Sequence, residues 1–96
     1  MIETRPTPSQ AMAALERLAA KMIDLFNTDE DYSWGGENDA EPDWFHFYAL
    51  FEYATGYDLG DDENPKFEEF LKWGLKATEA EIVAEALRLA KKLRED

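Results

Sequence analysis

The sequence predicts an all-α fold, a compact domain of four helices with a long acidic loop between the first two helices. Apolar residues recur at helical spacing over most of the chain, and a cap residue or a proline stands before each such run. No stretch alternates over five residues between turn signals, as a strand would. A short ribbon near residues 32–34 is also compatible with the sequence. At 96 residues the chain is expected to form one domain, 1–96.

The first two helices are expected on either side of the acidic loop. The first follows Thr7 and Pro8, a cap residue with proline at the first helical position. Its apolar side chains share one face: Met12, Leu15, Leu18, Ala19, Met22, Ile23 and Phe26. The second opens near Pro42 and closes at Gly56. It is apolar almost all round, which predicts burial against several neighbours, with a core of Trp44, Phe47, Tyr48 and Phe51.

The third and fourth helices also begin at recognisable signals. Asn64 and Pro65 start the third, which is expected to turn Phe67, Phe70, Leu71 and, less firmly, Trp73 inward. Thr78 and Glu81 form a capping box that starts the fourth. The inward face of the fourth helix is expected to hold Ile82, Val83, Ala86, Leu87, Ala90 and Leu93.

The negative charge is concentrated in the middle of the chain. Residues 28–65 carry twelve acids and no Lys or Arg, while the whole chain has a net charge of −12. These acids fall mainly in two connections, 27–41 and 57–64. Clustered like charges repel one another, so their segregation favours a functional explanation. Nucleic acid and anionic membranes would be repelled, and a basic protein surface is the expected partner.

Most site chemistries are disfavoured by the residue inventory. The chain has no cysteine and one histidine, His46, which lies among aromatic residues. A calcium loop starting at Asp58 would place Glu63 where glycine is needed, and one starting at Asp29 would end on Ala40. We therefore expect no metal, no cofactor and no enzymatic activity. Nothing resembles a signal peptide or a membrane span, so a cytoplasmic location is expected.

Two alternatives remain open for the acids of the first connection. Glu37, Asp39, Glu41 and Asp43 recur at every second residue, which in an extended chain would form a row spaced by about 6.5–7 Å. Such a row repeats negative charge as a nucleic-acid strand does. Alternatively, the last three of these acids cap the second helix and favour its dipole.

Two aromatic residues of the same connection also have two interpretations. Tyr32 and Trp34 are either anchors that pin the loop to the core or contact residues for a partner. The candidate partner-binding residues are Asp29, Asp31, Tyr32, Trp34, Glu37, Asp39, Glu41, Asp61, Asp62 and Glu63.

The profile of a helical, cysteine-free chain of this size with its acids gathered in one region resembles phage-encoded anti-defence proteins, namely anti-CRISPR and antirestriction DNA mimics. That resemblance implies a non-enzymatic inhibitor that occupies a basic nucleic-acid channel of its target. Residues 60–65, followed by a helix with Trp73, are similar to the acidic segment of bacterial nuclease immunity proteins. This implies the alternative of a nuclease inhibitor, and a structural interaction module of a phage or bacterium is a third possibility.

Overall fold

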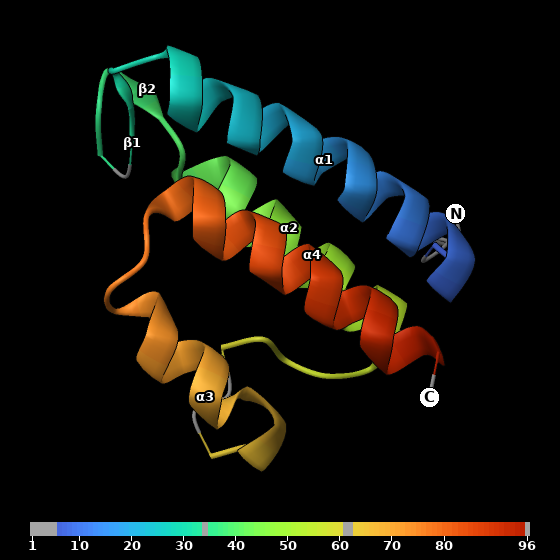
Figure 1. Cartoon of the computed structure of the whole chain (residues 1–96). Helices are drawn as coiled ribbons and strands as arrows, with labels where there is room; N and C mark the ends of the chain where they lie inside the picture. Colours follow the sequence, from blue (N-terminus) through green and yellow to red (C-terminus); the bar gives the residue numbers. More distant parts are fainter. Residues whose placement is uncertain (1–5, 34, 61–62, 96) are drawn as a thin grey trace.

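The computed structural model describes residues 6–33, 35–60 and 63–95. In chain order its elements are α1 (Pro8–Thr28), β1 (Tyr32–Ser33), β2 (Asn38–Asp39), α2 (Glu41–Thr55), α3 (Pro65–Gly74) and α4 (Glu79–Glu95) (Figure 1). The predicted predominance of helix is confirmed. The expected loop at 27–41 is shorter and more ordered than predicted, because α1 continues to Thr28 and the two short strands interrupt the connection.

α1, α2 and α4 build the core, and α3 stands beside them. α1 runs antiparallel to both α2 and α4 and contacts both, whereas α3 lies below this group (Figure 1). The buried apolar side chains come mainly from the facing sides of α1, α2 and α4. None of the helices within the described residues is both long enough and apolar enough to span a membrane.

α1 forms as its capping signal predicts. The Thr7 hydroxyl accepts a hydrogen bond from the Gln10 amide at 3.1 Å, and the Gln10 side chain accepts one from the Thr7 amide at 3.0 Å. This reciprocal pair satisfies two amides at the helix start. The predicted apolar face points inward. Its buried members are Met12, Leu15, Leu18, Ala19 and Met22, while Ile23 and Phe26 are half-buried against the core.

α2 differs from the prediction of a helix buried on all sides. Phe47 and Phe51 are fully buried, but Phe45 is 57 % exposed and Tyr48, expected in the core, is 38 % exposed. The reason is that the main packing partners of α2 are α1 and α4, which cover one face only. The helix ends at Gly56, whose φ of +81° is a left-handed conformation that glycine adopts without steric cost.

α4 and α3 are held to the core very differently. α4 starts at the predicted capping box, in which Thr78 and Glu81 exchange hydrogen bonds of 3.1 and 3.2 Å. It buries Val83, Ala86 and Ala90. α3 sends one fully buried side chain inward, Phe67, while Phe70 and Leu71 are half-buried and Trp73 remains 38 % exposed. Most of α3 therefore lies outside the main core.

Candidate partner-binding surface

The connection between α1 and α2 is an ordered turn. β1 and β2 pair in parallel, Tyr32 with Asn38 and Ser33 with Asp39. A turn between the strands is closed by a 3.1 Å hydrogen bond from the Gly36 amide to the Ser33 carbonyl. Gly36 makes this turn possible: a Cβ there would lie 2.5 Å from the backbone oxygen of Asp31, closer than atoms can approach.

Two carboxylates hold this turn together by accepting hydrogen bonds. Asp29 accepts from the Asp31 amide at 2.9 Å and from the Asn38 side chain at 3.0 Å. Asp39 accepts from the Gly35 amide at 3.0 Å and from the first amide of α2 at 2.9 Å. The bond from Asn38 and then that from Asp31 lower the pKa of Asp29, and the bonds from the α2 amide and then Gly35 lower the pKa of Asp39. Both acids therefore have a structural role.

Tyr32 is a core residue of this connection. It is only 3 % exposed, and its ring lies 4.6 Å from the ring of Phe26 between centroids. Its hydroxyl donates a 2.7 Å hydrogen bond to Asp43, whose other oxygen lies 3.4 Å from the ammonium of Lys21. Burial, and then the bond to Asp43, raise the pKa of Tyr32. Of the two interpretations, the structure favours the anchor, because the Tyr32 side chain is buried against the core.

The predicted row of evenly spaced acids is wrong. Of residues 37–43, only 38–39 belong to a strand, and Glu41 and Asp43 lie in the first turn of α2. A helical turn rotates successive side chains by about 100° and cannot continue the alternation of a strand. The capping alternative holds for Asp39, which accepts from the Glu41 amide. The cap residue itself is Ala40, which provides no side-chain hydrogen bond.

Three other acids of the connection point outward. Glu30, Asp31 and Glu37 are exposed, and within the described residues their carboxylates make no hydrogen bond or ion pair. Tertiary packing adds a fourth acid, because the start of α4 lies beside the connection. A hollow of about 510 Å³ is lined by Asp29, Glu30 and Tyr32 on one side and by Thr78 and Glu79 on the other. Glu30 and Glu79 are not among the residues predicted from the sequence, and Glu79 joins the connection only through the packing of α4.

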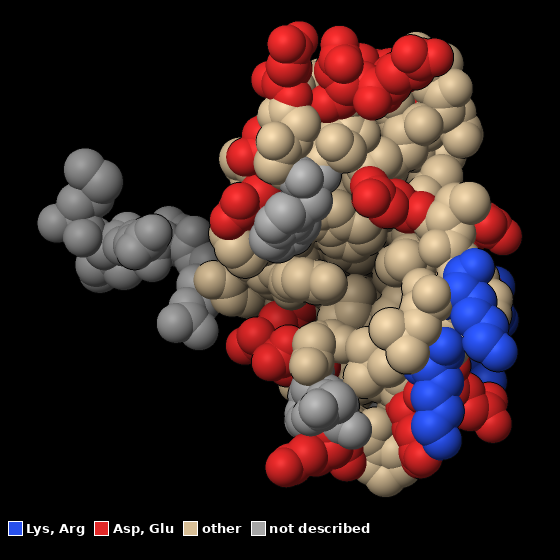
Figure 2. Space-filling view, turned by 90° about the vertical axis from the view of Figure 1, so that its left-hand side faces the viewer, with Lys and Arg blue, Asp and Glu red and all other residues tan. Residues whose placement is uncertain are grey.

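We call Glu30, Asp31, Glu37 and Glu79 the acidic end. Figure 2 shows acidic side chains gathered across the top of the molecule, where Figure 1 places β1, β2 and the end of α1 (Figures 1 and 2). The Lys and Arg side chains visible in this view lie lower, on the right-hand side. The field of Glu79 contributes to the raised pKa of Tyr32, after burial and the bond to Asp43. The acidic end is thus a region of concentrated negative potential.

A scan of protein-family models and searches of curated proteins and solved structures found no match to this chain. Within the described part of the chain, no three His, Cys, Asp or Glu side chains are placed to hold a metal ion. His46 is exposed on α2.

The second acidic connection is only partly described. Asp61 and Asp62, as well as Trp34 of the first connection, lie outside the described residues. Glu63 is exposed just before α3. Asp58 lies near Tyr48, where its charge adds to the effect of burial in raising the pKa of that tyrosine. Figure 1 places residues 57–60 and the two strands on opposite sides of the helical group, so the described parts of the two connections do not form one continuous surface.

Proposed function

We propose that this protein is a non-enzymatic inhibitor whose acidic end binds a basic protein surface that otherwise binds nucleic acid. The observation that carries the proposal is that neighbouring acids of the connection have two different roles: some accept internal hydrogen bonds and others stay exposed. Asp29, Asp39 and Asp43 accept the internal hydrogen bonds that order the connection. Glu30, Asp31 and Glu37 stay exposed on that ordered backbone.

Such an arrangement suits electrostatic recognition. A disordered acidic segment would have to lose conformational freedom on binding, whereas an ordered turn presents its charges with less entropic cost. Complementary charge also accelerates encounter with a basic partner, most strongly at low ionic strength. The same negative charge opposes direct binding to nucleic acid. Competition with nucleic acid for a shared protein surface follows from these two properties.

The class of target proposed is an anti-phage defence complex. The charge profile and the size of the chain support an anti-CRISPR or antirestriction protein that mimics nucleic acid and acts in the host cytoplasm. The partner surface would be the positively charged channel of a guide-RNA-loaded effector or of a restriction enzyme. Such a channel is built to receive phosphates at regular spacing.

The test replaces the exposed acids and leaves the structural ones in place. The triple variant Glu30→Gln, Asp31→Asn, Glu37→Gln removes three charges without touching an internal hydrogen bond of the described residues. A matched control removes three exposed charges elsewhere, with Glu16→Gln, Glu52→Gln and Glu68→Gln on α1, α2 and α3. The ion pairs of Glu16 with Lys91 and of Glu68 with Lys72 are exposed and contribute little to stability. Purified guide-RNA-loaded CRISPR effectors and restriction enzymes are the probes, and DNA binding and cleavage are the readouts.

The wild-type protein is expected to displace DNA from one of these probes, with an association rate that falls as salt rises. The acidic-end variant should associate more slowly, while the control should keep the wild-type rate. Equal rates for the two variants would exclude the acidic end as the binding surface. Inhibition of a DNase toxin that is lost on changing Asp61, Asp62 and Glu63 would instead identify an immunity protein.

A further inference from the structure

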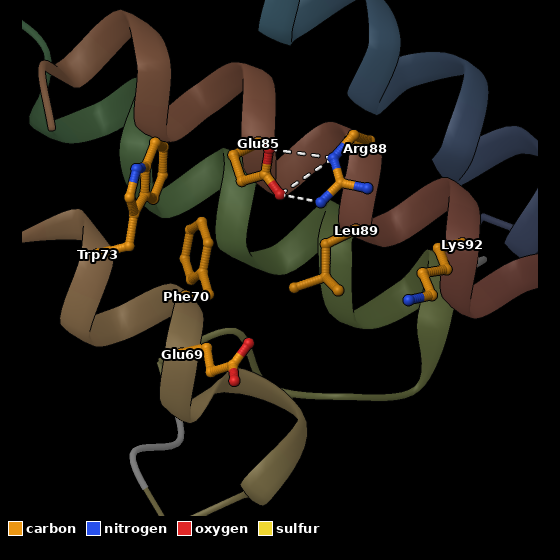
Figure 3. Close-up of a pocket in the computed structure, with 7 residues that line it drawn as sticks. All are labelled: Glu69, Phe70, Trp73, Glu85, Arg88, Leu89 and Lys92. Atoms are coloured by element: carbon orange, nitrogen blue, oxygen red, sulfur yellow. Dashed lines mark hydrogen bonds and ion pairs between the residues drawn. The ribbon is translucent and has the colours of Figure 1, made fainter.

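A groove lined by three apolar and four charged side chains separates α3 from α4. Its apolar side chains are Phe70 and Trp73 of α3 and Leu89 of α4, and its volume is about 430 Å³. Figure 3 shows the two aromatic side chains reaching from α3 toward α4, and their ring centroids are 6.0 Å apart (Figure 3). Trp73 is 38 % exposed. Apolar surface of this kind gains free energy when another molecule removes it from water.

The rim of the groove is electrically balanced. It carries two acids, Glu69 and Glu85, and two bases, Arg88 and Lys92. The Nε of Arg88 donates to both carboxylate oxygens of Glu85 at 3.0 Å, as the dashed lines in Figure 3 show. In a chain with a net charge of −12, this rim is a place where two copies can approach without strong local repulsion.

A side chain suited to fill such a groove stands close by in the sequence. Leu75 is 88 % exposed, the highest value among the large apolar side chains that the structure describes. It follows Trp73 by two residues, in a turn fixed by the hydrogen bond from the Lys76 amide to the Trp73 carbonyl at 3.0 Å. The same short region thus supplies both a groove and an exposed apolar side chain.

We propose that a second copy of this chain binds at the α3–α4 groove. The two copies are related by a twofold axis, and Leu75 of each enters the groove of the other. A twofold interface must be self-complementary, so each copy has to supply both halves of every contact. Each copy supplies a groove and a neighbouring exposed leucine, and its rim supplies one acid, Glu69, and one base, Lys92, besides the ion pair of Glu85 and Arg88.

The first experiment measures the mass of the full chain by sedimentation equilibrium as a function of concentration. A monomer has 11.1 kDa, and the wild-type protein is expected to reach twice that mass. Leu75→Gln should weaken dimerisation about a hundred- to ten-thousandfold, because the twofold dimer loses two buried leucines and each loss corresponds to a factor of about ten to a hundred. Ala20→Gln, at an exposed position of α1, is the control and should dimerise as the wild type does. A wild-type mass of 11.1 kDa up to about millimolar concentration would overturn the proposal.

The second experiment reverses the charges of the rim. Glu69→Lys gives a rim with excess base and Lys92→Glu a rim with excess acid, so each variant alone should dimerise more weakly than the wild type. An equal mixture of the two should recover dimerisation, since each copy then faces a rim of opposite charge. No recovery in the mixture, or an unchanged mass for Leu75→Gln, would show that the groove does not receive a second copy. Neither outcome depends on the acidic end or its target.

Discussion

The hydroxyl of Tyr32 donates a 2.7 Å hydrogen bond to Oδ2 of Asp43, and this bond joins the acidic connection to the first turn of α2. The Asp43 side chain is 22 % exposed and also lies 3.4 Å from the ammonium of Lys21 on α1. One carboxylate therefore connects three segments of the chain. Its position explains how a stretch with so many acids can keep a defined conformation.

Tyr32→Phe is expected to lower the free energy of unfolding by about 1–2 kcal/mol. The substitution keeps the buried ring and removes the hydroxyl, and hydrogen bonds to charged groups contribute about 1.5–3 kcal/mol, less where the site is partly open to solvent. Urea unfolding at neutral pH measures the change. Tyr48→Phe is the control, because within the described residues the hydroxyl of Tyr48 donates no hydrogen bond. Similar losses in both variants would contradict a special role for the bond to Asp43.

Phe47→Ala and Phe51→Ala should each unfold most of the protein at room temperature or leave it marginally stable. Both side chains are fully buried, and such a truncation costs about 3–5 kcal/mol against a total stability of about 5–15 kcal/mol for a typical domain. Circular dichroism during urea unfolding gives the stability. Phe45→Ala truncates a side chain of the same helix that is 57 % exposed and should cost much less stability. A stable Phe47→Ala protein would mean that this face of α2 is not the core.

The melting temperature should rise between about 10 and 300 mM NaCl, because salt shortens the distance over which the clustered acids repel one another. The acidic-end variant Glu30→Gln, Asp31→Asn, Glu37→Gln should start from a higher melting temperature at low salt and respond less. Differential scanning calorimetry at several salt concentrations measures both curves. If the two proteins respond equally, repulsion at the acidic end does not limit stability.

The pH dependence should reveal the two structural carboxylates. Hydrogen bonds lower the pKa of Asp29 and of Asp39 in the folded state, below the unfolded value of about 3.9. The folded state then binds fewer protons in this range. The stabilisation from the two groups is thus fully present above the unfolded pKa and is lost as the pH falls through the folded pKa.

Asp29→Asn and Asp39→Asn should therefore be less stable than the wild type at pH 7, and the difference should be smaller near about pH 3, because the stabilisation begins to be lost below the unfolded pKa of about 3.9. Urea midpoints at the two pH values give the comparison. Glu37→Gln changes an exposed acid without internal hydrogen bonds in the described residues and should show no loss at pH 7. Parallel pH curves for the wild type and both Asn variants would refute the assigned role.

α3 should exchange its amide hydrogens faster than α1, α2 and α4. Among the side chains of α3 that the structure describes, only Phe67 is fully buried, and its ring centroid lies 5.9 Å from that of Phe51 and 6.2 Å from that of Tyr57. Local opening is easiest where few apolar contacts are lost. Hydrogen exchange followed by mass spectrometry tests this order. Phe67→Ala should accelerate exchange in α3 much more than in α1, and equal protection of α3 and α4 in the wild type would contradict the prediction.

The sequence by itself determined where the helices begin and how the charge is divided. The capping box of α4 and the cap of α1 act through hydrogen bonds between residues three apart, so they can be read locally. The apolar faces of α1 and α4 follow from helical periodicity for the same reason. The acidic middle of the chain is visible in composition alone.

Only the tertiary structure decided which acids are structural and which are exposed. The contact between Tyr32 and Asp43 spans eleven positions, and Glu79 joins the acidic end from a helix that starts far along the chain. Such contacts depend on how α1, α2 and α4 pack, which no local pattern encodes. The exposure of Trp73 also depends on tertiary packing. The spacing of apolar residues shows which of them share a face of α3, but it does not show how closely that face approaches the neighbouring helices.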